Sequence, residues 1–141
     1  MSGRALLSRL DKVRRTGQGR WLARCPAHND RGPSLSIREL DDGRLLVHCF
    51  AGCDIGSVLS SLSLDMDVLF PEGEIRHAKS ERRPFPASDV LRCIAFEALV
   101  VATAGAAILA RHAFSQIDSD RLIVAVGRIQ AALSTAGLDL E

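Results

Sequence analysis

The first residues of the chain repeat apolar and charged positions with the period of an α-helix. The apolar side chains of residues 2–15 fall on one helical face, and most of the basic side chains fall elsewhere. Glycines at positions 17 and 19 predict the end of this helix, because glycine readily adopts the left-handed conformation that closes a helix. The expected apolar face consists of Leu6, Leu7, Leu10 and Val13.

The pattern then changes to short strands joined by tight turns. Residues 21–24 form a short extended run, and residues 34–40 alternate between an apolar face and a face of serine and arginine. Residues 41–43 (Asp-Asp-Gly) predict a hairpin turn, after which residues 44–50 return as the next strand. Asp54 is placed to cap a short helix that follows.

Two longer helical segments are predicted near the C-terminus, after linker composition at residues 72–87. The first begins near residue 88, and alanine recurs in it at every fourth position, which lets another helix approach closely. The second begins near Asp118 or Ser119 and ends at Gly137, so an antiparallel helical hairpin is the simplest arrangement. The alanine stripe is Ala98, Ala102, Ala106 and Ala110, and the apolar positions of the second helix are Leu122, Val126, Ile129 and Leu133.

The charge of the chain is unevenly distributed. The 141 residues are 47% hydrophobic and 25% charged, which excludes a wholly disordered or collagen-like protein, and the net charge is +1. Residues 1–38 carry nine basic and two acidic side chains, whereas residues 39–75 carry one basic and eight acidic ones. A nearly neutral chain with so basic a first quarter can still present a basic surface.

Basic residues interrupt every early apolar run, so no signal sequence is predicted and we expect a cytoplasmic protein. Cysteines in that compartment more often hold metal or stay reduced than form disulfides. Residues 93–110 carry a single charge, Glu97, and just reach the length of a membrane span. They are rich in alanine rather than leucine and lie between Arg92 and Arg111, so we expect no membrane partner.

Two pairs of metal-ligand residues are the most informative feature of the sequence. Cys25 and His28 form the first pair, and Cys49 and Cys53 form the second after 20 intervening residues. Zinc takes four such ligands in a tetrahedron at about 2.0–2.3 Å, and the predicted hairpin can bring the two pairs together. Four protein ligands leave no position for a water molecule, so we predict one structural Zn²⁺ that contributes to folding.

The remaining cysteine and histidines are not expected to bind this metal. His48 lies next to Cys49 on a strand and therefore points to the opposite face of the sheet. Cys93 is expected to be a small core residue of the first long helix. His77 and His112 have no partner at ligand spacing.

Residues 1–71 resemble the Cys-His-Cys-Cys zinc-binding domain of bacterial DNA primases, in the version found in phages and mobile elements. The likeness rests on residues 21–30 (WLARCPAHND), 33–37 (PSLSI) and 48–53 (HCFAGC). It implies a zinc ribbon on a small antiparallel sheet that binds single-stranded template and helps a separate catalytic domain to begin primers. The chain departs from the cellular primases in Ala27, where they usually have an aromatic residue, and in the longer spacing of its second pair.

The resemblance does not extend to the polymerising domain of that family, which holds metal on a glutamate and an Asp-x-Asp motif. Asp118 and Asp120 have this spacing, but they open a helical pattern, where acidic residues are expected on electrostatic grounds. We therefore expect no catalytic residues and no enzyme activity beyond an accessory part in a primase.

These observations predict an α+β fold, with a small antiparallel zinc-ribbon sheet, flanking helices and a C-terminal α-helical hairpin. The expected units are a ribbon domain at residues 1–71, a linker at 72–87 and the hairpin at 88–141. We expect single-stranded DNA to contact the polar face of the ribbon, and we expect Trp21 and Phe50 to be buried rather than to stack on bases. The predicted DNA contacts are Arg20, Arg24, Arg31, Arg38 and Arg44.

The leading hypothesis is a non-catalytic DNA-binding protein of the bacterial cytoplasm that acts in primer synthesis for a phage or mobile element. Its helical C-terminus would tether it to a primase, helicase or replisome protein, or to a second copy through the alanine-striped helix. The alternative is a protein-interaction adaptor or inhibitor that keeps the ribbon only as a scaffold.

Overall fold

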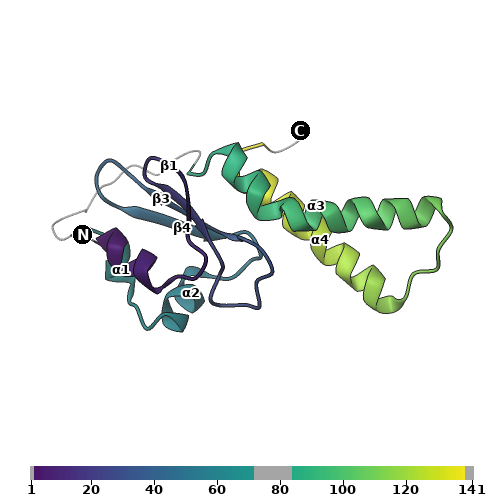
Figure 1. The fold of residues 1–141 in the computed structure, drawn as a ribbon, viewed down its shortest axis with the longest axis horizontal. Coiled ribbons are helices and arrows are strands. Elements are labelled where there is room, and N and C mark those ends of the chain that lie inside the picture. Colours follow the sequence, from purple (N-terminus) through teal and green to yellow (C-terminus); the bar gives the residue numbers. More distant parts are fainter. Residues whose placement is uncertain (1, 72–83, 139–141) are drawn as a thin grey trace.

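Four short strands form one antiparallel sheet in the order β1-β2-β3-β4 (Figure 1). The computed structural model describes residues 2–71 and 84–138. The α+β prediction is confirmed, including the C-terminal helical pair, which extends away from the sheet (Figure 1). The strands are β1 (Arg14–Gly17), β2 (Arg20–Ala23), β3 (Leu35–Glu39) and β4 (Leu45–Cys49). The helices are α1 (Ser2–Arg9), α2 (Ile55–Ser61), the 3₁₀ helix η1 (Met66–Leu69), α3 (Ala87–Leu109) and α4 (Gln116–Thr135).

The first helix is shorter than the sequence predicts. It ends at Arg9, and the chain then turns through Lys12, whose φ of 54° is left-handed. Residues 14–17 are strand β1, which pairs with β2 through a turn that contains Gly19 at a φ of 63°. The prediction of a helix over residues 2–15 is confirmed for residues 2–9 and wrong for residues 14–15, because glycines that can end a helix can equally close a β-hairpin.

One face of the sheet packs against α1, α2 and η1 and forms the first hydrophobic core. Leu35 and Ile37 point to this face and are fully buried, as the alternation along β3 predicts. α2 begins where predicted, because the Asp54 side chain accepts a hydrogen bond from the backbone N–H of Ser57. The buried members of this core are Leu6, Ala23, Cys25, Leu35, Ile37, Leu45, Cys49, Val58, Leu59 and Leu69.

The opposite face of the sheet, which the sequence predicts to be polar, is covered by the base of the helical hairpin. The ring of Phe85 lies 6.0 Å from that of Phe50 and 5.9 Å from that of His48. Ser36 lies on this face and is nevertheless fully buried. Strand β3 is therefore buried on both faces. The second core comprises Leu22, Phe50, Phe85, Val90, Cys93, Ile94, Ala132 and Ala136.

Two hydrogen bonds fasten the helical hairpin to the sheet. The hydroxyl of Thr16 in β1 donates to the buried carboxylate of Asp89 in α3 at 2.9 Å. The Arg38 guanidinium donates to the backbone carbonyl of Pro84 at 2.9 Å. Residues 72–83 of the predicted linker lie outside the described residues, whereas Phe85, near the end of that linker, belongs to the second core.

Small residues and one buried carboxylate form the contact between α3 and α4. Ala125 and Ala132 of α4 are almost fully buried. Glu97 of α3 is 7% exposed and accepts hydrogen bonds from Arg121 at 2.7 Å and Arg128 at 2.8 Å. The apolar seam predicted for α4 is partly wrong: Leu122, Ile129 and Leu133 are half-buried, but Val126 is 40% exposed.

α4 begins with a capping box. The hydroxyl of Ser115 accepts the backbone N–H of Asp118, and the Asp118 carboxylate accepts the backbone N–H of Ser115. Asp120 accepts a hydrogen bond from Gln116 at 2.7 Å. The expectation that these two acidic residues belong to a helix start is thus confirmed, although the cap is Ser115 rather than Asp118 or Ser119. The helix ends as predicted, at Gly137 with a φ of 70°.

The alanine stripe of α3 does not face α4. Ala98, Ala102, Ala106 and Ala110 are exposed, as are Leu91 (64%) and Leu99 (61%). α3 carries only three charged residues, Asp89, Arg92 and Glu97. By length and composition this helix is apolar enough to cross a membrane, with a mean hydropathy of 1.8 over 18 residues. Buried core helices of soluble proteins pass the same test, but only 22% of this window is buried.

Candidate metal centre

The two ligand pairs meet at one end of the sheet because of the strand register. Ala23 in β2 lies opposite Leu35 in β3, and Leu35 lies opposite Cys49 in β4. Cys25 follows β2 by two residues, and Cys49 is the last residue of β4. Both cysteines therefore lie at the same end of the sheet. The loop after each strand then supplies the second ligand of its pair, His28 or Cys53.

The four predicted ligands are close enough to bind one metal ion. The ligand atoms of Cys25, His28, Cys49 and Cys53 all lie within 4.8 Å of one another. His28 Nδ1 lies 3.2 Å from the Cys53 sulfur and 3.8 Å from the Cys49 sulfur. In a tetrahedral site the sulfur and nitrogen ligands are about 3.6 Å apart, so these distances suit one tetrahedral metal ion. None of the four cysteines of the chain forms a disulfide.

A single carboxylate organises the loop that carries the first pair. Asp30 Oδ2 accepts hydrogen bonds from the backbone N–H of Cys25 at 2.8 Å and from the backbone N–H of Ser34 at 3.2 Å. The Ser34 hydroxyl donates to the same oxygen at 2.7 Å, and Asp30 Oδ1 accepts the N–H of Gly32. These bonds close residues 25–34 into a compact loop, which sets the distance between Cys25 and His28.

The same groups orient the imidazole of His28. Its Nδ1 faces the thiols, while its Nε2 lies 3.4 Å from the Ser34 hydroxyl and 3.6 Å from Asp30 Oδ1. A proton on Nε2 is thus directed toward Ser34 and Asp30, which leaves the Nδ1 lone pair for a metal ion. Metal-bound histidines in proteins commonly have such a hydrogen-bonded partner on the second nitrogen.

The second pair depends on a glycine in the left-handed conformation. Gly52 has a φ of 96°, and its backbone N–H donates to the carbonyl of Cys49 at 3.1 Å. This turn brings Cys53 back toward Cys49. The backbone N–H of Phe50 donates to the carbonyl of Ser34 at 2.8 Å, which holds the second loop against the first.

The buried thiols of the cluster are electrostatically coupled. A hydrogen bond from the Cys25 thiol lowers the pKa of Cys49 to about 4, and the same contact raises the pKa of Cys25. Burial raises the pKa of Cys53. A metal ion held by all three sulfurs would require their thiolate forms, so its binding would weaken as the pH falls.

The residues that the sequence excludes as ligands lie elsewhere. The His48 ring packs against Phe50 on the opposite face of the sheet, at 4.6 Å between centroids, and burial lowers its pKa. Cys93 belongs to the second core, as predicted. His112 is exposed beyond the end of α3, and His77 lies outside the described residues.

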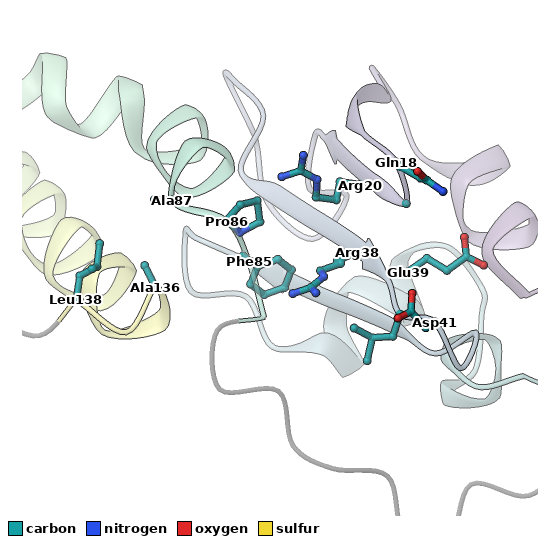
Figure 2. A pocket seen from close by; sticks show the side chains of 12 residues that line it. Gln18, Arg20, Arg38, Glu39, Asp41, Phe85, Pro86, Ala87, Ala136 and Leu138 are labelled. Atoms are coloured by element: carbon teal, nitrogen blue, oxygen red, sulfur yellow. The ribbon is translucent and has the colours of Figure 1, made fainter.

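The five arginines predicted to contact DNA do not all line one cavity. Arg20 and Arg38 are cross-strand neighbours that border a cavity of about 830 Å³, together with the acidic residues Glu39 and Asp41 (Figure 2). Figure 2 shows Arg38 beside Phe85, which also lines this cavity.

The other three arginines do not line this cavity. Arg44 forms an ion pair with Asp42 at 2.7 Å, Arg24 is exposed after β2, and Arg31 is exposed on the loop of the first pair. The two aromatic residues behave largely as expected: Phe50 is 5% exposed, and Trp21 is half-buried against the first core.

Sequence reasoning did not single out Asp30 and Ser34 as supports of the first pair. Their signal was present, since an aspartate two residues after a ligand often accepts backbone hydrogen bonds in a tight turn. It also did not find the contact of Glu97 with Arg121 and Arg128, because residues so distant in sequence carry no periodic signal.

Comparisons of the chain with models of protein families, with curated proteins and with solved structures find no match. The likeness to primases therefore rests on the residues around the two ligand pairs. The structure adds that these four residues converge on a site that can hold one metal ion.

Proposed function

We propose that this chain is a non-catalytic zinc-ribbon protein that binds DNA and acts in primer synthesis for a phage or mobile element in the bacterial cytoplasm. The observation that carries the proposal is the Cys-His-Cys-Cys cluster, whose ligand atoms lie within 4.8 Å of one another at one end of an antiparallel sheet. The primase-like sequence around this cluster supplies the functional context.

Zinc is the metal that best suits this donor set. Three thiolates and one imidazole are ligands that zinc prefers in closed structural sites. Cys25 and His28 would hold one side of the ion and Cys49 and Cys53 the other. Such an ion links the loops after β2 and β4 and supplies folding free energy rather than a reactive water molecule.

The helical hairpin is the proposed tether to a primase, helicase or replisome protein. Support comes from the outer face of α3, where Leu91, Leu99 and the alanine stripe are exposed and uncharged. A helix in water normally keeps polar residues on its outer side, so a face of this kind suits a partner helix, including that of a second copy.

The first experiment measures metal content and DNA binding on the same preparation. We expect one zinc per chain by elemental analysis. We also expect the anisotropy of a labelled single-stranded oligonucleotide to rise on titration, more than that of the matching duplex. Binding should weaken as salt increases, because phosphate contacts release counterions. An absence of binding at low salt, where electrostatic attraction is strongest, would refute the DNA-binding function.

The second candidate function is a protein-interaction adaptor or inhibitor that uses the ribbon as a scaffold. One observation favours it: the sheet face expected to meet DNA is packed beneath Phe85 and the base of the hairpin. On this hypothesis, the zinc-loaded chain binds a primase or helicase of its host element without binding oligonucleotides. Leu91→Glu in the outer face of α3 should then abolish that binding, while Leu91→Ala weakens it less.

A further inference from the structure

A cavity of about 760 Å³ lies between the loop of the first ligand pair and the two long helices. One wall is formed by residues 28–34, and the other by α3 and α4. We call this cavity the cationic groove. Its arginines are Arg31 from the loop, Arg92 from α3, and Arg121 and Arg128 from α4.

The acidic residues of the groove do not cancel this charge. Glu97 alone serves both Arg121 and Arg128, so one carboxylate faces two guanidinium groups. Asp30 keeps its negative charge while it accepts backbone N–H groups of the loop, and the buried Asp89 carboxylate faces Arg92. Four basic side chains therefore face three acidic ones, so the groove keeps a small excess of positive charge that an anion can use.

Two of the arginines are also accessible to a ligand. Arg31 is exposed on the loop. The side chain of Arg92 remains 53% exposed although it contacts Asp89 at 3.3 Å. Neither side chain is held in the contact between α3 and α4, so both can turn toward a bound phosphate.

An exposed aromatic ring lies among these arginines. Phe96 of α3 lines the groove and is 41% exposed, and the Arg121 guanidinium carbon lies 5.7 Å from the centre of its ring. Guanidinium groups that hold phosphates, next to a ring on which a base can stack, are typical of surfaces that bind single strands. In a duplex the bases are already stacked on one another, so the ring favours unpaired DNA.

We propose that the cationic groove is the path of single-stranded DNA on this protein, with Arg31 and Arg92 on phosphates and Phe96 stacked on a base. This inference rests on the proposed DNA-binding function and moves the contact from the sheet to the junction between ribbon and hairpin. It also gives the metal site a role in binding. Cys25 and His28 position the loop that carries Arg31, so the groove depends on the first ligand pair.

The test compares variants of the full zinc-loaded chain against a labelled single-stranded oligonucleotide over a salt series. Arg31→Gln with Arg92→Gln should flatten the dependence of log K on log salt by about 1.4, since each lost phosphate contact contributes about 0.7. Phe96→Leu should weaken binding at least about fivefold at every salt concentration, because it removes the ring and keeps an apolar side chain. Arg4→Gln with Arg111→Gln, exposed and outside the groove, removes the same charge and should change neither quantity.

The outcomes distinguish failure of the groove proposal from failure of the DNA-binding function on which it rests. If the wild-type protein binds the oligonucleotide and the groove variants bind it equally well, the groove is not the DNA path, although the DNA-binding function is retained. A loss of binding in the double variant Arg24→Gln with Arg44→Gln would then assign the DNA contact to the ribbon. If the wild-type protein does not bind at low salt, the proposed function itself fails. Zinc content and near-ultraviolet circular dichroism identify any variant that does not fold, and Arg92→Gln alone then replaces the double variant.

Discussion

Replacement of Glu97 by glutamine tests whether the buried ion-pair cluster holds the helical hairpin together. The Glu97 carboxylate accepts hydrogen bonds from Arg121 at 2.7 Å and Arg128 at 2.8 Å, and its residue is 7% exposed. Burial alone would raise the pKa of Glu97, but the hydrogen bonds from the two arginines outweigh it and hold the pKa below its usual value. The charged form is therefore the one that the fold stabilises.

The expected loss of stability is moderate. Hydrogen bonds to charged groups contribute about 1.5–3 kcal/mol each, but Arg121 and Arg128 are 35% and 32% exposed and can turn to water when the carboxylate is lost. Glutamine can keep one of the two bonds through its carbonyl oxygen. We therefore expect Glu97→Gln to lower the free energy of unfolding by about 2 kcal/mol.

Urea unfolding of the zinc-loaded protein, followed by far-ultraviolet circular dichroism, measures this change. Asp120→Asn is the matched control, because it removes one negative charge from an exposed position of the same hairpin and should leave stability essentially unchanged. The pKa of Glu97 is lower in the folded protein, so its contribution is complete above the unfolded pKa of about 4.3 and is lost as the pH falls through the folded value. A Glu97→Gln variant as stable as the control at pH 7 would refute this account of the hairpin.

Three further predictions concern the metal site and the sheet. Cys53→Ser should lower zinc affinity by at least about tenfold, measured by competition with a chelator, and equal affinity would exclude Cys53 as a ligand. Gly52→Ala should lower zinc affinity about five- to thirtyfold, because a φ of 96° costs an L-residue about 1–2 kcal/mol. Gly32→Ala is the control, because no atom lies within 4 Å of the added methyl group, and it should bind zinc like the wild type. Equal losses of zinc affinity in Gly52→Ala and Gly32→Ala would contradict the role of the left-handed φ of Gly52. Ser36→Ala should leave the free energy of unfolding unchanged or raise it by up to about 1 kcal/mol, since the buried Ser36 hydroxyl has no hydrogen-bond partner among the described residues. A clear decrease in thermal unfolding experiments would show that this hydroxyl does have a partner.

The elements that the sequence predicts well are those set by local chemistry. Residues 41–43 form a turn with Gly43 at a φ of 84°, Asp54 caps α2, and Gly137 closes α4. Each depends on residues only a few positions apart, and their side chains or backbone angles decide the structure wherever the segment lies. The ligand pairs belong to the same class, because a spacing of three or four residues restricts both partners to one turn.

The predictions that failed or were incomplete concern segments whose structure depends on distant partners. The run at residues 14–17 is compatible with a helix, but pairing with β2 makes it a strand. Ser36 was placed on a polar face, yet Phe85 and the hairpin cover it. The alanine stripe was expected to receive another helix, but α4 packs on the side of α3 that carries Glu97.

By itself, the sequence determined the α+β class, the hairpin of helices and the identity of four residues that can bind one metal ion. Spacing and periodicity carry this information because they act over a few residues. Only the tertiary structure decided that the hairpin base covers the second face of the sheet, and that Arg31 meets Arg92, Arg121 and Arg128 in one groove. The loop and the helices are separated by about sixty to a hundred residues in the chain. Their approach is set by burial of Phe50, Phe85 and the alanines of α4, a non-directional force that leaves no local pattern.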